Sequence, residues 1–223
     1  MNIAFIPVRG GSKSIPLKNI KEICGRPLVY WTARAANDAN CIDKVIIATD
    51  SSEIKTVVID FNLPKVEIYN RSSENAQDTS STESVMFEYI KQSNLKPNDK
   101  FFLIQATSPM LESKHIDEMH EKFIKEKADS AFSCVLTKRF FWTKDAKPVN
   151  YDYKNRPRRQ DFEGYMLENG ACYINSVENI LREKNRICGK MCLYEMPEYT
   201  SYEIDEPDDF IIIEELMKRH NFI

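Results

Sequence analysis

Short runs of apolar, β-favouring residues alternate with amphipathic stretches along most of this chain of 223 residues. The candidate strands are Ile3–Val8, Lys44–Thr49, Val66–Tyr69, Phe101–Gln105 and Ser130–Leu136. Most of them are too continuously apolar to leave one face in water, and helical spacing follows several of them, as after Leu28 and after Ser113, a candidate helix cap. The alternation predicts βαβ units, and therefore an α/β fold with a mostly parallel sheet covered by helices on both faces.

Length and composition predict a single domain over residues 1–223. With 42% hydrophobic residues, the chain can bury one core but is short for two. Residues 137–169 break the alternation, because they are rich in Lys, Arg, Pro, Tyr and Asp and have no sustained period. Such a segment is too long for an ordinary connection, so we expect an excursion from the core with a function of its own.

The charge balance gives no global reason for a nucleic-acid or membrane-surface partner, since the formal net charge is −3 and the isoelectric point is near 5.8. No run approaches the roughly 18 apolar residues of a membrane helix, and no basic segment with a long apolar stretch opens the chain, so we expect a cytoplasmic protein.

Six cysteines are scattered without a CxxC pair, which indicates reduced packing thiols rather than disulfides or a zinc site.

The loop after the first candidate strand, within NIAFIPVRGGSKSIPLKNI, is the strongest local signal. In a parallel sheet, ligands bind beyond the carboxyl ends of the strands, where this loop is expected. It matches neither the dinucleotide fingerprint, because the next glycine after Gly10 and Gly11 is Gly25, nor the P-loop, because Ser12 rather than glycine precedes Lys13.

The same loop nevertheless has the composition of an anion cradle. Its glycine pair lets backbone N–H groups approach an anion, Arg9, Lys13 and Lys18 flank the pair, and Pro16 restricts the chain. These features suit a triphosphate. The alternative is a flexible exposed turn whose basic side chains are only solvated.

The segment IPVRGGSKSIPLKNI resembles the signature loop of the acylneuraminate cytidylyltransferases, also called CMP-sialic acid synthetases. Further similar motifs follow in order: ATDS at 48–51, RSSENAQDTSST at 71–82, QATSP at 105–109 and RPRRQDFEGYMLENGACYI at 156–174. With GKMCLYEM, the set looks closest to the vertebrate-type catalytic domain, without the additional phosphatase-like domain of vertebrate members. The Kdo cytidylyltransferases are a weaker resemblance. The family implies a Rossmann-like nucleotidyltransferase domain.

By resemblance, the chain is expected to join CTP and a nine-carbon 2-keto sugar acid of the Neu5Ac or Kdn type, giving CMP-sugar and pyrophosphate. In that reaction the anomeric hydroxyl attacks the α-phosphate, Mg²⁺ is the cofactor, and the charge developing on pyrophosphate must be stabilised. Two alternatives stay open: a cytidylyltransferase for legionaminic, pseudaminic or Kdo acid, and a CTP-binding regulator without catalysis.

The resemblance also implies a set of site residues. Those expected in the nucleotide pocket are Arg9, Ser12, Lys13, Lys18, Asn19, Arg71 and Ser80. Arg9 and Lys18 are expected on the phosphates and, with Asp205, in catalysis; Arg71 and a hydroxyl near Ser80 are expected on cytosine. The ordinary alternative for the serines is a helix start, since DTSSTES is rich in capping residues.

The sugar acid is expected to meet Gln105, Arg159 and Tyr173, although Thr107–Pro109 could merely cap a helix and Tyr173 could be core. In the family, the arginine corresponding to Arg159 reaches the neighbouring subunit's sugar acid, which implies a homodimer formed through the excursion. Trp142 could wall the sugar pocket or anchor that interface.

Metal ligation is expected from the segment SYEIDEPDDF. Glu203 and Asp205 point the same way along an extended chain, so two hard oxygen ligands share one face. The family usually has Asp-x-Asp here, which leaves direct ligation by the longer Glu203 less secure. The acids of Glu206–Asp209 look instead like the first turn of a helix.

Overall fold

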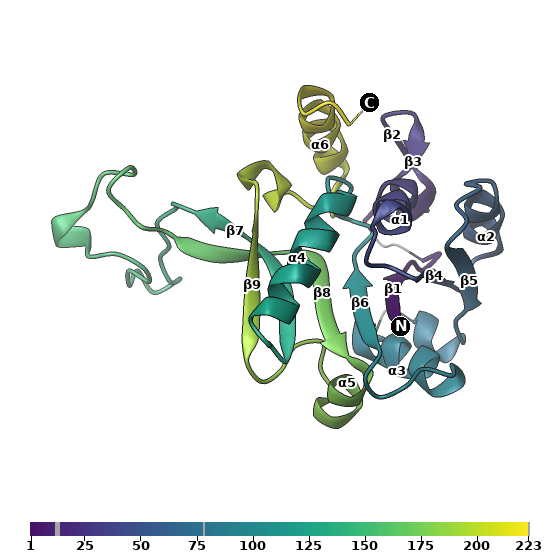
Figure 1. Cartoon of the computed structure of the whole chain (residues 1–223). Coiled ribbons are helices and arrows are strands. Elements are labelled where there is room, and N and C mark those ends of the chain that lie inside the picture. Colours follow the sequence, from purple (N-terminus) through teal and green to yellow (C-terminus); the bar gives the residue numbers. More distant parts are fainter. Residues whose placement is uncertain (12–13, 78, 223) are drawn as a thin grey trace.

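A computed structural model describes residues 1–11, 14–77 and 79–222 (Figure 1). Within them, seven strands form one sheet in the order β5-β4-β1-β6-β8-β7-β9. These strands are β1 (Asn2–Pro7), β4 (Lys44–Thr49), β5 (Val66–Asn70), β6 (Lys100–Ile104), β7 (Ser130–Thr137), β8 (Tyr165–Ser176) and β9 (Met191–Met196). A separate antiparallel ribbon pairs β2 (Glu22–Ile23) with β3 (Arg26–Pro27).

Helices cover both faces of the sheet, as the alternation predicted. The α-helices are α1 (Leu28–Asp38), α2 (Ser52–Ile59), α3 (Thr82–Gln92), α4 (Ser113–Lys125), α5 (Val177–Glu183) and α6 (Pro207–Arg219). Short 3-10 turns are η1 (Lys18–Ile20), η2 (Glu74–Ala76), η3 (Tyr153–Asn155) and η4 (Glu198–Ser201). None of the helices in the described ranges is long and apolar enough to cross a bilayer.

Strand β1 divides its side chains between two apolar clusters, because successive residues of a strand point to opposite faces. Ala4 and Ile6 pack with α1, α2 and α4. Ile3 and Phe5 pack with α3 and α5 on the other face. A strand apolar at every position is therefore buried on both sides, which is why its sequence shows no alternation.

The sheet is mostly parallel. Strand β1 runs parallel to both β4 and β6, β5 is parallel to β4, and β9 is parallel to β7. Strand β8 is antiparallel to its neighbours β6 and β7. The chain passes from β1 outward to β4 and β5 and then returns to β6 on the other side of β1. The carboxyl ends of β1 and β6 thus flank a topological switch point, where open α/β sheets bind ligands.

The excursion protrudes from the sheet between β7 and β8 (Figure 1). It is shorter than the expected 137–169, because residues from Tyr165 onward already pair with β7. Its own aromatic side chains hold it together: the ring centroids of Phe140 and Tyr151 are 4.3 Å apart, and those of Phe140 and Phe162 are 5.0 Å apart. The segment therefore has a packed interior despite its lack of sequence period.

Of the two helix starts predicted near residues 113 and 206, one was wrong and one is confirmed. The prediction of a Ser113 cap was wrong: Glu112 is the N-cap of α4, in a capping box with His115. Glu206–Asp209 does begin a helix, with Glu206 as the N-cap of α6 and Pro207 in its first position. Histidine is outside the usual capping-box pattern, so the start of α4 could not be recognised from local sequence.

Candidate functional site

A cavity of about 250 Å³ opens at the carboxyl ends of β1 and β6. Its lining includes six of the predicted residues: Arg9, Lys18, Asn19, Arg71, Ser80 and Gln105. Ser81, Thr82 and Val85 of the α3 region complete one wall. The described lining contains three cationic side chains and neither Asp nor Glu. The cavity therefore favours an anionic ligand.

The opening loop is pressed against the start of α2. The Gly10 N–H donates to Asp50 Oδ1 at 3.1 Å, and a Cβ at Gly10 would lie 2.8 Å from Ser51 Cβ. Gly11, in contrast, has nothing within 4 Å of such a Cβ. The first glycine is needed for close approach and the second is not. Ser12 and Lys13, both predicted in the nucleotide pocket, lie outside the described residues.

Asn19 and Lys18 fix the other end of this loop. Asn19 is buried and its Nδ2 donates to the Arg9 carbonyl at 3.2 Å. Lys18 Nζ donates to the Ile204 carbonyl at 2.8 Å and pairs with Asp205 Oδ1 at 3.2 Å. The expected phosphate lysine and the expected metal carboxylate are thus in contact, although 187 positions separate them.

Glu203 lies beside this contact in a partly buried position. Burial and the neighbouring Asp205 charge raise the pKa of Glu203 to about 7, against opposing effects of Lys18 and of a hydrogen bond with Thr107. A Cβ at Gly170 would lie 2.9 Å from both Glu203 carboxylate oxygens, and Gly170 also has a φ of 68°. Glycine at 170 therefore lets the longer Glu203 side chain fold back there.

The two carboxylates fit a hard divalent cation, because such an ion would relieve the mutual repulsion that the Glu203 pKa records. Within the described ranges, no group of three or more His, Cys, Asp or Glu side chains could hold a metal. Mg²⁺ commonly takes only one or two protein carboxylates together with substrate phosphates. Glu203 and Asp205 are thus donors that a bound triphosphate would have to complete.

Arg71 is a buried guanidinium with one unsatisfied donor. Its Nη2 donates to the Asn75 carbonyl, whereas its buried Nε has no partner among the described residues. Burial lowers the Arg71 pKa, and the nearby charges of Asp50 and Glu88 oppose that effect. A buried donor without a partner is costly, so Arg71 is held in this position against an energetic penalty.

Glu88 of α3 organises the loop that carries Arg71, and no sequence motif indicated it. Its carboxylate accepts hydrogen bonds from Tyr69 Oη at 2.8 Å, from Ser72 N at 2.8 Å, from Ser72 Oγ at 2.6 Å and from Asn75 Nδ2. Desolvation alone would raise the Glu88 pKa, but the Ser72, Asn75 and Tyr69 hydrogen bonds lower it to about 2. Ser80 Oγ donates to the Glu74 carbonyl at 2.9 Å in the same loop.

Two predicted sugar residues are not part of the described cavity lining. Tyr173 is 4% exposed in the core on the α3 side, and its hydroxyl donates to Glu168. Arg159 is 71% exposed and pairs with Glu198 at 3.3 Å. Trp142 lies on the excursion, where its Nε1 donates to Tyr151 Oη at 2.9 Å. These residues therefore do not complete the cavity of their own chain.

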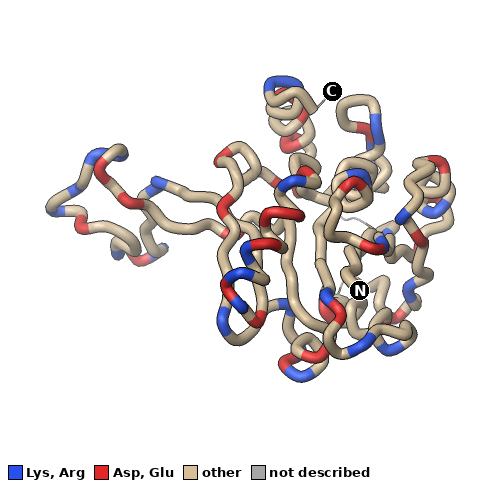
Figure 2. The backbone as a smooth tube through the Cα atoms, in the orientation of Figure 1, with Lys and Arg blue, Asp and Glu red and all other residues tan. Residues whose placement is uncertain are grey.

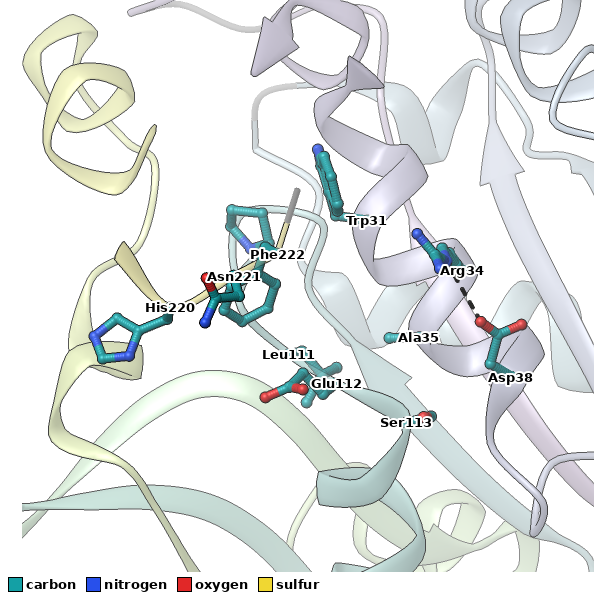
Figure 3. A pocket seen from close by; sticks show the side chains of 11 residues that line it. Trp31, Arg34, Ala35, Asp38, Leu111, Glu112, Ser113, His220, Asn221 and Phe222 are labelled. Carbon is teal, nitrogen blue, oxygen red and sulfur yellow. Dashed lines mark ion pairs between the residues drawn. The ribbon is translucent and has the colours of Figure 1, made fainter. Parts of the chain in front are cut away.

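A second hollow, of about 220 Å³, lies between α1, the start of α4 and residues 220–222 (Figure 3). Its polar residues include Arg34 and Asp38, which pair at 3.4 Å. None of the residues predicted for the site lines it. The cavity at β1 and β6 is therefore the candidate site.

A family model described as cytidylyltransferase matches residues 3–222. The chain belongs to the cytidylyltransferase family. It is 38% identical to N-acylneuraminate cytidylyltransferase A of Danio rerio, over 98% of this chain and 51% of the relative. It is 26% identical to pseudaminic acid cytidylyltransferase of Campylobacter jejuni, over 93% of this chain and 92% of the relative. The chain thus spans about half the length of the Danio rerio relative.

The fold is similar to that of a solved CMP:2-keto-3-deoxy-manno-octonic acid synthetase complexed with CTP. The TM-score is 0.70 at 16% identity, and the match covers 98% of this chain and 99% of the other. This likeness confirms the expected Rossmann-like architecture. The relatives confirm the resemblance seen in the motifs, with the Danio rerio protein at 38% identity and a Streptococcus agalactiae N-acylneuraminate cytidylyltransferase at 29%.

Gly10→Ala should destabilise the protein because its new Cβ would meet Ser51 Cβ at 2.8 Å. The free energy of unfolding, measured with urea, should fall by about 1–3 kcal/mol, as is usual for overpacking. Gly11→Ala is the matched control and should change it by less than about 0.5 kcal/mol. Equal effects of the two substitutions would contradict the close approach described for Gly10.

Glu88→Gln should remove one source of pH-dependent stability. The wild-type carboxylate has a pKa of about 2, against an ordinary value of 4.5, so the unfolded state takes up a proton first as the pH falls. The wild-type advantage over Glu88→Gln, from urea unfolding, should be complete near pH 7 and fade between about pH 5 and pH 2. Glu67→Gln, an exposed partner of Lys44, should cost less than about 0.5 kcal/mol. A Glu88→Gln deficit that is constant down to pH 2 would exclude the assigned role.

Proposed function

We propose that this chain transfers CMP from CTP to the anomeric hydroxyl of a 2-keto sugar acid, releasing pyrophosphate. The observation that carries the proposal is the cavity in which Arg9, Lys18 and Arg71 converge, with Asp205 outside the described lining but in contact with Lys18. Family membership and the printed names of the relatives support the reaction class. We infer a nine-carbon acid of the Neu5Ac or Kdn type; pseudaminic acid is the second candidate, favoured by the match over nearly the whole Campylobacter jejuni relative.

The reaction forms a bond from the anomeric oxygen to the α-phosphorus, breaks the bond from that phosphorus to the bridging oxygen of pyrophosphate, and releases the hydroxyl proton to solvent. Arg9 and Lys18 would neutralise the phosphate oxygens, and Arg71 brings a third cationic side chain to the same cavity. Asp205 and Glu203 would hold Mg²⁺, which would supply positive charge next to the phosphates. Gln105 lines the same cavity with an amide that can both donate to and accept from sugar hydroxyls.

We further propose that the site is completed by a second copy of the chain. Arg159 is strongly exposed and lies outside the cavity of its own subunit. The protruding segment carries many Lys and Arg residues (Figure 2) and exposes apolar side chains: Trp142, Val149, Tyr153 and Tyr165. Exposed apolar area of this kind marks a protein interface. A guanidinium brought by that interface suits the planar carboxylate of a sugar acid.

The function is tested by pyrophosphate release from CTP against Neu5Ac, Kdn, legionaminic, pseudaminic and Kdo acids. We expect turnover that needs Mg²⁺ and is fastest with a nine-carbon acid. Lys18→Met should lower kcat/KM by a factor equivalent to about 2–4 kcal/mol of transition-state stabilisation. Lys44→Met, a surface control paired with Glu67, should not. Binding of CTP without turnover of any acid would favour the non-catalytic regulator.

The shared site is tested by subunit complementation. Arg159→Ala and Lys18→Ala should each be nearly inactive alone. After subunit exchange, the mixed dimer contains one site with an intact Lys18 from one chain and an intact Arg159 from the other, so activity should return. Verified mixed dimers without activity would mean that Arg159 serves its own subunit or no substrate.

A further inference from the structure

One well-shielded ion pair lies beside the candidate site. Arg186 Nε contacts Glu83 Oε1 at 2.6 Å, and the side chains are only 22% and 20% exposed. The neighbouring pair of Arg182 and Glu183 has a similar separation of 2.8 Å, but its side chains are 57% and 45% exposed. Shielded pairs interact more strongly than exposed ones and are costly to break on one side only.

The acidic member of the pair directly follows residues that line the cavity, but it is not itself in the described lining. Glu83 is in the first turn of α3, directly after the lining residues Ser80, Ser81 and Thr82. Burial would raise the Glu83 pKa, but the hydrogen bond from Arg186 and a backbone hydrogen bond lower it below its usual range. The site thus carries an ionised carboxylate next to a cavity built for an anion, and an unneutralised charge there would repel the ligand.

The backbone around Arg186, the basic member of the pair, is anchored by hydrogen bonds. Arg186 lies in the connection between α5 and β9, where its carbonyl accepts from Asn175 Nδ2 at 3.0 Å. Two residues later, Cys188 N donates to Ser130 Oγ at 2.9 Å. Anchoring of this kind reduces the side-chain freedom lost when the pair forms.

A second contact holds the Arg186 guanidinium over the sheet. Its central carbon lies 5.1 Å from the centroid of the Tyr173 ring, within the range of a cation–π interaction. Tyr173 is opposite Leu103 of β6, two positions before the lining residue Gln105. Arg186 is therefore held on both sides, by Tyr173 on β8 and by Glu83 on α3.

We propose that Arg186 is a positioning residue of the nucleotide cavity, which it serves by neutralising and fixing Glu83 beside the cavity lining. The proposal rests on the proposed function, in that the anion admitted to the cavity is CTP. Arg186 itself touches Glu83 and Tyr173 and has no assigned contact with the substrate. Its effect is therefore electrostatic and is made through Glu83.

The test compares Arg186→Met with Arg182→Met, a substitution of the same type only four positions away. Arg186→Met leaves Glu83 charged and unpaired, so the Kd for CTP from calorimetry and the KM for CTP should rise roughly five- to twentyfold. The kcat should change less than about threefold, since the reacting groups are untouched. Arg182→Met should match the wild type. Unchanged CTP affinity in folded Arg186→Met would overturn the proposal.

Glu83→Gln shows whether Arg186 acts by neutralising the Glu83 charge or by stabilising the local structure. It removes the carboxylate and keeps Arg186, so CTP should bind at least as tightly as to the wild type. The double variant Glu83→Gln with Arg186→Met should recover CTP affinity to within about threefold of the wild type. If the ion pair only stabilised the local structure, CTP affinity would fall equally in Arg186→Met, Glu83→Gln and the double variant. That result would refute the assigned role.

The same measurements separate this proposal from the proposed function. If the wild-type protein neither binds CTP nor releases pyrophosphate, both the proposed function and the role of Arg186 are contradicted. If the wild-type protein binds CTP and Arg186→Met binds it equally well, only the role of Arg186 is contradicted.

Discussion

The central position of β1 is the constraint on which the rest of the structure depends. Its backbone pairs in parallel with β4 on one side and β6 on the other, and its side chains are buried against helices on both faces. A strand held in this way leaves little choice for the loop that follows it. Arg9 and Gly10 emerge where the strand order reverses, and the lining residues after β6 emerge next to them.

The electrostatics of the cavity depend as much on its neighbouring acids as on its own cations. Asp50 accepts from the Gly10 N–H, Glu88 accepts hydrogen bonds from the Arg71 loop, and Glu83 is paired with Arg186. Each carboxylate accepts hydrogen bonds from local donors, and for Glu83 the donor is itself a cation. The cationic lining can then act on a ligand, while Asp205 and Glu203 stand together on the side where a metal is expected.

The sequence predicted β1, β4, β5, β6 and β7 because most of these strands contain a nearly continuous apolar run. Strands β8 and β9 were not among the candidates. In β9 every second residue is exposed, and the exposed first part of β8 includes Glu168 and is followed by Asn169 and Gly170. Patterns of this kind carry less apolar signal than a fully buried strand.

For the site, motifs identified side chains but not their contacts. Six predicted residues line the cavity, whereas Tyr173 lies in the core on the α3 side and Arg159 lies outside. The roles assigned to Glu88 and Arg186 had no sequence signal, because each depends on partners distant along the chain. Pairing between such residues follows from the tertiary fold and not from local spacing.

The contact of Lys18 with Ile204 and Asp205 has a consequence for how the protein is made. Translation delivers Lys18 long before Ile204 and Asp205, which lie 186 and 187 positions later. The sheet has the same delay, since β6 pairs with β8 only after the excursion has been synthesised. The described lining of the cavity lies within residues 7–107, so it emerges from the ribosome well before the Ile204 carbonyl and the Asp205 carboxylate that hold Lys18. Lys18 therefore reaches its final partners only late in synthesis, and contacts between residues so far apart along the chain slow folding.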